Sequence, residues 1–175
     1  MKRSINACPC QIVLCGRGGQ GILFLTRVLT EVALLRGHSV ISSETHGMAM
    51  RGGSVVSFIK IGDFFSPLIR SKQADILFVL SETELIQNQH FARPTGSQIY
   101  INAKEPRKRS IDADSLAVRL GSPVTANLVL LGFACAHPDF PYSHDEIAQC
   151  IRKISTASMV DQNLKSFYEG YYSFS

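Results

Sequence analysis

The residues best placed to do chemistry lie in two glycine-containing clusters. The first cluster, which directly follows the apolar run 11–15, consists of Gly16, Arg17, Gly18, Gly19, Gln20 and Gly21. The second cluster contains Glu44, His46, Gly47, Met48, Arg51, Gly52 and Gly53. Because glycine has no Cβ, backbone amides in such segments can approach a phosphate or another chain closely. The two clusters therefore predict a binding surface.

The first cluster fits the G-x-G-x-x-G pattern of phosphate-binding loops through Gly16, Gly18 and Gly21. A strand is expected before it and an apolar helix over residues 20–36 after it, which is the context that the pattern requires. Gln20 adds an amide side chain at the start of that helix, where it could bond a phosphate or a neighbouring chain. A tight strand-to-helix turn without a ligand is the alternative interpretation.

The second cluster allows several roles. Glu44 is the acidic residue at the end of the expected second strand, where an NAD-binding fold would use it to hold ribose hydroxyls. It could equally orient Arg51, whose guanidinium offers a fork for carboxylate or phosphate, or cap the loop. Met48 favours a protein interface, because methionine adapts to a partner surface, and His46 could titrate near neutral pH.

No complete catalytic apparatus or metal site is evident elsewhere. The five cysteines include no C-x-x-C spacing, which argues against both a disulfide framework and an iron–sulfur cluster held by this chain. No Ser-His-Asp set or paired carboxylates stand out. The basic stretch from Lys104 to Arg109 is interpreted as a solvated loop that could meet the far phosphate of a ligand. We therefore predict no catalytic residue and no metal ligand.

Size and composition limit the classes of protein that fit. The 175 residues are 45% hydrophobic and 18% charged, which predicts a single domain over residues 1–175. The net charge of +4 is spread along the chain, so small anionic ligands fit better than nucleic acid. No apolar run is long enough for a membrane span or a signal peptide, and we expect a cytoplasmic protein.

Strands and helices are expected to alternate. The predicted strands cover 11–15, 38–43, 54–61, 74–80 and 98–101, and a turn at 62–63 is expected to make a hairpin of 54–61 with 64–69. The predicted helices are 20–36, one opened by a capping box of Ser81 with Glu84, one capped by Asp112 and ended by Gly121, 127–136, one opened by Ser143 with Glu146, and 161–172. This order predicts an α/β fold, a three-layer Rossmann-like sandwich with a mostly parallel sheet and a β-hairpin.

Several motifs taken in order resemble one family. They are 16–21 (GRGGQG), 46–55 (HGMAMRGGSV), 66–69 (SPLI) with 74–75 (AD), 126–132 (ANLVLLG) and 163–170 (NLKSFYEG). Together they resemble the gamma-type subunit of 2-oxoacid:ferredoxin oxidoreductases, the family that acts on pyruvate, ketoisovalerate, 2-oxoglutarate or indolepyruvate. The sequence His46-Gly47-Met48 is most similar to the corresponding segment of the beta subunit of indolepyruvate:ferredoxin oxidoreductase.

The resemblance implies a subunit of a complex that oxidatively decarboxylates a 2-oxo acid to an acyl-coenzyme A and reduces ferredoxin. Thiamine diphosphate and iron–sulfur clusters would lie on a large partner subunit, and this chain would not be active alone. The first cluster would contact coenzyme A and the second would face the catalytic subunit. A homodimer is compatible with the isolated chain. Two alternatives stay open: a stand-alone NAD-binding oxidoreductase, and a non-enzymatic scaffold subunit.

Overall fold

A six-stranded sheet forms the centre of the computed structural model, which describes residues 9–46 and 52–174. The strand order is β2-β3-β1-β4-β5-β6. The strands are β1 (Cys10–Arg17), β2 (Val40–His46), β3 (Ser54–Ile61), β4 (Ile76–Val79), β5 (Gln98–Asn102) and β6 (Ser110–Ile111). Of these six strands, β3 runs opposite to the other five, so the predicted α/β fold with a mostly parallel sheet is confirmed.

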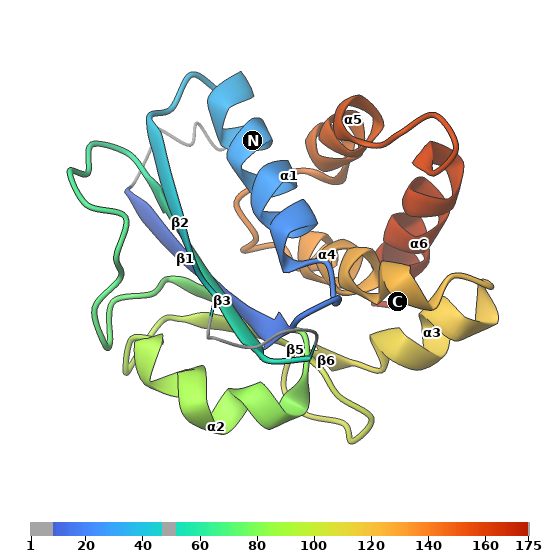
Figure 1. Cartoon of the computed structure of the whole chain (residues 1–175), viewed down its shortest axis with the longest axis horizontal. Coiled ribbons are helices and arrows are strands. Elements are labelled where there is room, and N and C mark those ends of the chain that lie inside the picture. Colours follow the sequence, from blue (N-terminus) through green and yellow to red (C-terminus); the bar gives the residue numbers. More distant parts are fainter. Residues whose placement is uncertain (1–8, 47–51, 175) are drawn as a thin grey trace.

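Helices cover the two faces of the sheet unequally. One face packs against a helical layer that is two helices deep in places, whereas the other carries the short α2 and irregular chain (Figure 1). The α-helices are α1 (Ile22–Leu35), α2 (Leu85–Asn88), α3 (Ala113–Arg119), α4 (Ala126–Ala136), α5 (His144–Ile154) and α6 (Val160–Tyr172). Three 3-10 turns, Glu82–Glu84, Gln89–Phe91 and Pro123–Thr125, flank α2 and precede α4.

Alternation along β1 divides the core between these faces. Ile12 and Leu14 join the larger apolar cluster under α1 and α4, whereas Val13 and Cys15 join the smaller cluster on the α2 side. Successive strand side chains point to opposite faces, so a strand buried on both sides has a continuous apolar sequence. This is why the runs at β1 and β4 could be recognised as interior strands.

The predicted hairpin is wrong. Residues 64–69 form no strand, and β3 pairs instead with β2 on one side and β1 on the other. Both edges of β3 are therefore occupied, which leaves no place for a returning strand after the turn at Gly62. The antiparallel neighbours adjacent in sequence are β2 and β3, and β2 runs past the predicted end at Ser43 to His46.

The predicted capping box of Ser81 with Glu84 is also wrong. Ser81 Oγ lies 2.9 Å from Thr83 Oγ1, and the Glu84 side chain turns inward to accept a 2.7 Å hydrogen bond from Ser54 Oγ. The capping box of Ser143 with Glu146 is confirmed, as is the cap by Asp112, which accepts from the Ser115 amide at 3.0 Å. The sequence did not predict β6, which is only two residues long.

Within residues 9–46 and 52–174, no helix combines the length and apolar character that crossing a membrane requires.

Candidate functional site

The two glycine clusters meet at the carboxyl end of β1. The Gly18 amide donates a 2.9 Å hydrogen bond to the Gly53 carbonyl oxygen, and a Cβ on Gly18 would lie 3.2 Å from the Gly52 nitrogen. The structure therefore brings together parts of both predicted sets. Gly47, Met48 and Arg51 lie outside the described residues, and of His46 only the backbone, at the end of β2, is described.

The first half of the loop, residues 16–18, is bound within the protein. The Arg17 amide donates to Gln20 Oε1 at 2.7 Å, and the Gln20 amide donates to the Arg17 carbonyl at 3.1 Å. Gly16 is buried, and a Cβ there would lie 2.8 Å from Gln20 Oε1 and 2.9 Å from Leu80 Cβ. The amides of Arg17 and Gly18 are thus occupied, so this half shapes the loop instead of offering donors to a ligand.

The Arg17 side chain points toward Glu84. Its Nε lies 3.9 Å from Glu84 Oε1, and the side chain is 52% exposed. Glu84 is buried on the α2 side, where Ser54 donates to it. Arg17 continues the alternation of Val13 and Cys15, which directs it to this face. Sequence reasoning placed Glu84 in a capping box with Ser81 and therefore missed this role, which depends on the distant residues Arg17 and Ser54.

The second half of the loop, residues 19–21, is open. Gly19 and Gly21 have φ angles of 95° and 74°, which side chains with a Cβ rarely adopt. Gly21 is the N-cap of α1, and no side chain caps this helix or places an acidic group in its first turn. The amides of Gly19 and Gly21 donate to no residue in the described part of the chain. Uncapped amides at a helix N-terminus favour an anion.

Two hollows border this open half. The first hollow is open to solvent and has a volume of about 510 Å³. Its lining residues are Gly19, Gln20, Leu80, Asn102, Asp114, Pro123, Val124, Ala126 and Asn127. The second hollow, about 840 Å³, lies beside the first turn of α1, and its lining includes Gly19, Gly21, Phe24, Arg27, Thr156 and Met159. Arg27 supplies a cation to the second hollow, whereas Asp114 supplies a carboxylate to the first. An anionic group is therefore favoured in the second hollow.

Polar side chains fix the junction of these hollows. Asn127 Nδ2 donates to the Gly21 carbonyl at 3.1 Å, which ties α4 to the start of α1. The Leu80 carbonyl accepts from Gln20 Nε2 and from Asn102 Nδ2, each at 3.1 Å. Sequence reasoning found Gln20 but missed Asn102 and Asn127, because only the fold brings their elements to the loop.

The sheet order places this site at a topological switch point. From β1 the chain passes through α1 to β2 on one side, while from β4 it continues to β5 on the other side. Ligands of open α/β sheets bind outside the carboxyl ends of the strands where such connections diverge. The open half of the loop and the first hollow occupy that position in this chain, and the second hollow adjoins them along α1.

The same sheet order weakens the NAD interpretation. In the dinucleotide-binding fold, β2, which carries the acidic residue, lies directly beside β1. Here the antiparallel β3 separates them, so Glu44 is two strand spacings, about 10 Å, from β1. Glu44 is exposed and lines a shallow groove with Thr26, Arg27 and Ser42.

The buried cysteines Cys15 and Cys135 do not resemble cluster ligands. Burial raises the pKa of the Cys15 thiol to about 12 and that of Cys135 well above its ordinary value. Thiols of that kind stay protonated at neutral pH, whereas metal ligation needs the thiolate. Among residues 9–46 and 52–174, no three His, Cys, Asp or Glu side chains group closely enough to hold a metal ion.

The basic loop after β5 is partly anchored. Arg107 pairs with Glu82, and Arg109 pairs with Asp139 and donates to Tyr100 Oη at 2.8 Å. Lys104 and Lys108 are exposed. Because β5 ends at Asn102, which lines the first hollow, this loop starts at the same edge of the sheet as the glycine clusters.

Comparison with known proteins identifies the family. The family model described as pyruvate ferredoxin/flavodoxin oxidoreductase matches residues 11–173. The chain belongs to this family. It is 30% identical to the indolepyruvate oxidoreductase subunit IorB of Archaeoglobus fulgidus over 91% of this chain and 92% of that protein. The predicted resemblance to gamma-type subunits is thereby confirmed.

Solved structures share the fold. The gamma subunit of a keto/oxoacid ferredoxin oxidoreductase from Geobacter sulfurreducens superposes with a TM-score of 0.75 at 21% identity, covering 94% of this chain and 98% of that chain. A 2-oxoglutarate:ferredoxin oxidoreductase from Magnetococcus marinus gives 0.77 at 16% identity. The match covers 97% of this chain but 31% of that longer chain, so the present fold corresponds to one part of a larger polypeptide there.

Proposed function

We propose that this chain is the IorB-type small subunit of an indolepyruvate-type 2-oxoacid:ferredoxin oxidoreductase. The complex would convert a 2-oxo acid and coenzyme A into an acyl-coenzyme A and carbon dioxide, passing two electrons to ferredoxin. The similarity to the IorB subunit and the sequence His46-Gly47-Met48 support this branch of the family. Thiamine diphosphate and iron–sulfur clusters would reside on a larger partner subunit, because the five cysteines of this chain include no C-x-x-C spacing.

Within that complex, the open half of the loop would contact coenzyme A. The observation that carries this proposal is the uncapped start of α1 at Gly21, which opens between two hollows at the switch point of the sheet. The free amides and Arg27 would hold the phosphates on the side of the second hollow. The first half of the loop would fix the position of these groups through its internal hydrogen bonds.

The second glycine cluster would face the partner subunit. Gly52 is exposed beside Gly18, so a chain seated on this cluster would also touch the edge of the first cluster. Gly47, Met48 and Arg51 lie outside the described residues, and their contact with the partner stays part of the proposal. This arrangement would connect coenzyme A binding with the subunit that carries out the decarboxylation.

A pair of substitutions at Gly19 tests coenzyme A contact. A Cβ at Gly19 meets no atom within 4 Å, so Gly19→Asn and Gly19→Asp differ in charge while sharing the same strain at φ 95°. We expect the KM for coenzyme A of the complex to be about tenfold higher for Gly19→Asp than for Gly19→Asn, because a carboxylate repels phosphates in a partly desolvated site. Equal KM values for the two variants would contradict the proposal.

A further inference from the structure

Two carboxamides from different parts of the chain converge on one carbonyl in the first hollow. Gln20 and Asn102 both donate to the Leu80 oxygen, and each also accepts a backbone amide. Gln20 Oε1 accepts from the Arg17 amide at 2.7 Å, and Asn102 Oδ1 accepts from the Ala113 amide at 2.9 Å. Among side chains of this length, a carboxamide can donate and accept at its tip in this way whereas a carboxylate cannot donate.

Each of these carboxamides has a second N–H. No acceptor for it is found among residues 9–46 and 52–174, although both side chains line the first hollow. Asp114 adds an acceptor to the same hollow, and Pro123 and Val124 add apolar surface. The lining therefore combines amide donors with a carboxylate, which matches a neutral group that carries carbonyl and N–H together.

We propose that Asn102, together with Gln20, binds the amide-bearing pantetheine arm of coenzyme A in the first hollow. This inference rests on the proposed function and places the two ends of coenzyme A in different hollows. Phosphates fit the second hollow with Arg27, while the first hollow, whose charged lining residue is Asp114, takes an uncharged arm. Asn102 is then a specificity-determining residue that the motifs of the sequence do not include.

The substitution Asn102→Asp separates binding from folding. The aspartate keeps an oxygen for the Ala113 amide at the start of α3, where negative charge is favourable, but loses the donor to Leu80 and to the ligand. Gln98→Glu is the matched control on the same strand. Gln98 Nε2 donates to the Asp139 carbonyl at 2.7 Å, and Gln98 begins β5 while Asn102 ends it.

The experiment measures the KM for coenzyme A and kcat of the complex containing each variant. We expect Asn102→Asp to raise KM about tenfold, equivalent to about 1.4 kcal/mol, with kcat within about twofold, and Gln98→Glu to leave both near wild type. Equal KM values for Asn102→Asp and wild type would overturn the inference. A similar rise for both variants would also overturn it, because a loss of strand packing would then explain the effect.

Pantetheine, which carries the amides without the nucleotide, tests the assignment of the two ends. As a competitive inhibitor, it should bind Asn102→Asp about tenfold more weakly than wild type, yet bind the Gly19→Asp and Gly19→Asn variants equally well. Equal inhibition of wild type and Asn102→Asp would place the arm elsewhere and overturn the inference. If the Gly19 pair differs in KM for coenzyme A while Asn102→Asp has no effect, the proposed function stands and only this inference fails. An equal KM for the Gly19 pair would instead count against the proposed function.

Discussion

The two ends of α1 differ in how their backbone groups are satisfied. At the carboxyl end, the Gly37 and His38 amides donate to the Leu34 and Ala33 carbonyls at 2.9 and 3.1 Å. At the amino end, Gly21 provides no side-chain cap. Helix ends leave several groups without partners inside the helix, and these are normally satisfied by caps, water or ligands. The protein therefore closes one end of this helix itself and leaves the other open.

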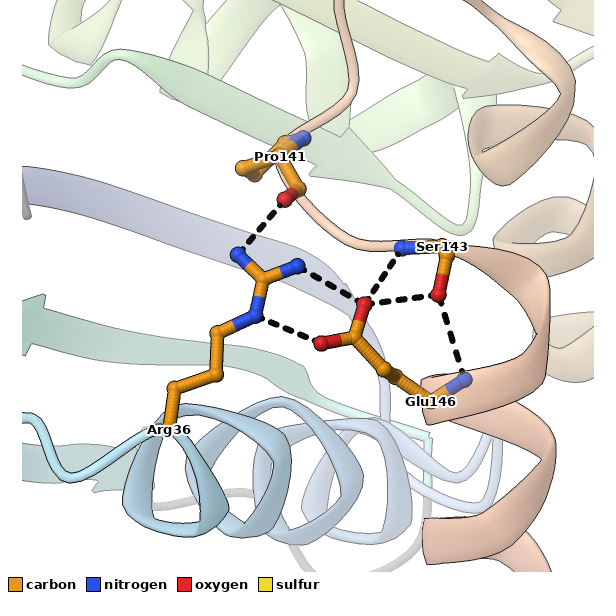
Figure 2. A network of polar contacts seen from close by, with 4 residues as sticks. All are labelled: Arg36, Pro141, Ser143 and Glu146. Carbon is orange, nitrogen blue, oxygen red and sulfur yellow. Dashed lines mark hydrogen bonds and ion pairs between the residues drawn. The ribbon is translucent and has the colours of Figure 1, made fainter. Parts of the chain in front are cut away.

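Side chains reinforce the closed end. The Arg36 guanidinium donates to both Glu146 oxygens at 2.7 Å and to the Pro141 carbonyl at 2.9 Å, while Glu146 also accepts from Ser143 in the cap of α5 (Figure 2). This network joins α1 to α5 at the end away from the glycine loop. A helix of 14 residues spans about 21 Å, so anchoring at one end holds the other in a fixed position. We therefore expect substitutions at the closed end to change stability and substitutions at the open end to change ligand binding.

The largest predicted effect concerns Gly16, which precedes the open end. Gly16→Val would place a side chain against Leu80 Cβ and Gln20 Oε1, both already within 3 Å of a Cβ. Overpacking of this kind costs about 2–3 kcal/mol of unfolding free energy. Urea unfolding of the isolated chain measures this loss. A variant as stable as wild type would show that the first half of the loop is not tightly packed.

The next effect concerns the closed end. Arg36→Met keeps much of the apolar stem but removes three hydrogen bonds, and we expect a loss of about 1–2 kcal/mol in unfolding free energy. The KM for coenzyme A of the assembled complex should not change. A raised KM with unchanged stability would reverse the roles that we assign to the two ends.

The closed end should also respond to acid. The hydrogen bonds from Arg36, followed by those from Ser143, lower the pKa of Glu146 to about 2 from its ordinary 4.5. A lowered pKa in the folded state contributes stability above the ordinary pKa, and this contribution is lost as the pH falls from about 5 toward 2. Because Glu146 is partly exposed, the contribution is about 1 kcal/mol or less. Unfolding midpoints of wild type and Glu146→Gln should therefore converge between pH 5 and pH 2, and a constant difference would contradict this origin.

The smallest stability change is expected at the open end. Arg27 is exposed beside the second hollow, so Arg27→Met should alter unfolding free energy by less than about 0.5 kcal/mol. The same substitution should raise the KM for coenzyme A several-fold, because it removes a cation from the proposed phosphate contact. Arg36→Met is the matched control on the same helix. Unchanged KM for Arg27→Met would move the phosphates away from this end.

Much of the fold followed from local patterns. The strand runs, the helix ended by Gly37, and the caps at Asp112 and Ser143 were predicted correctly, because alternation and capping act over a few residues. The misplaced hairpin shows where such reasoning fails. The turn at Gly62 is present, but β3 is paired with strands on both sides. Pairing between strands that are distant in sequence leaves no local signal.

The candidate site was predicted in part. The glycine loop was found because its spacing has a direct physical meaning, but its division into bound and open halves depends on Gly53 and Leu80, which lie far away in sequence. Asn102 was not identified because asparagine at the end of a strand is unremarkable until α3 and Leu80 are placed beside it. The binding roles of both glycine clusters remain predictions, and Gly47, Met48 and Arg51 lie outside the described residues.

Amide hydrogen exchange in the complex with and without coenzyme A tests most directly whether the open end of α1 is the contact. We expect coenzyme A to slow exchange at residues 19–24, where α1 is open, and to leave exchange at residues 36–39 unchanged, where the helix is closed. Unchanged exchange at residues 19–24 with coenzyme A bound to the complex would contradict this expectation, because the open end of α1 would then not be the contact.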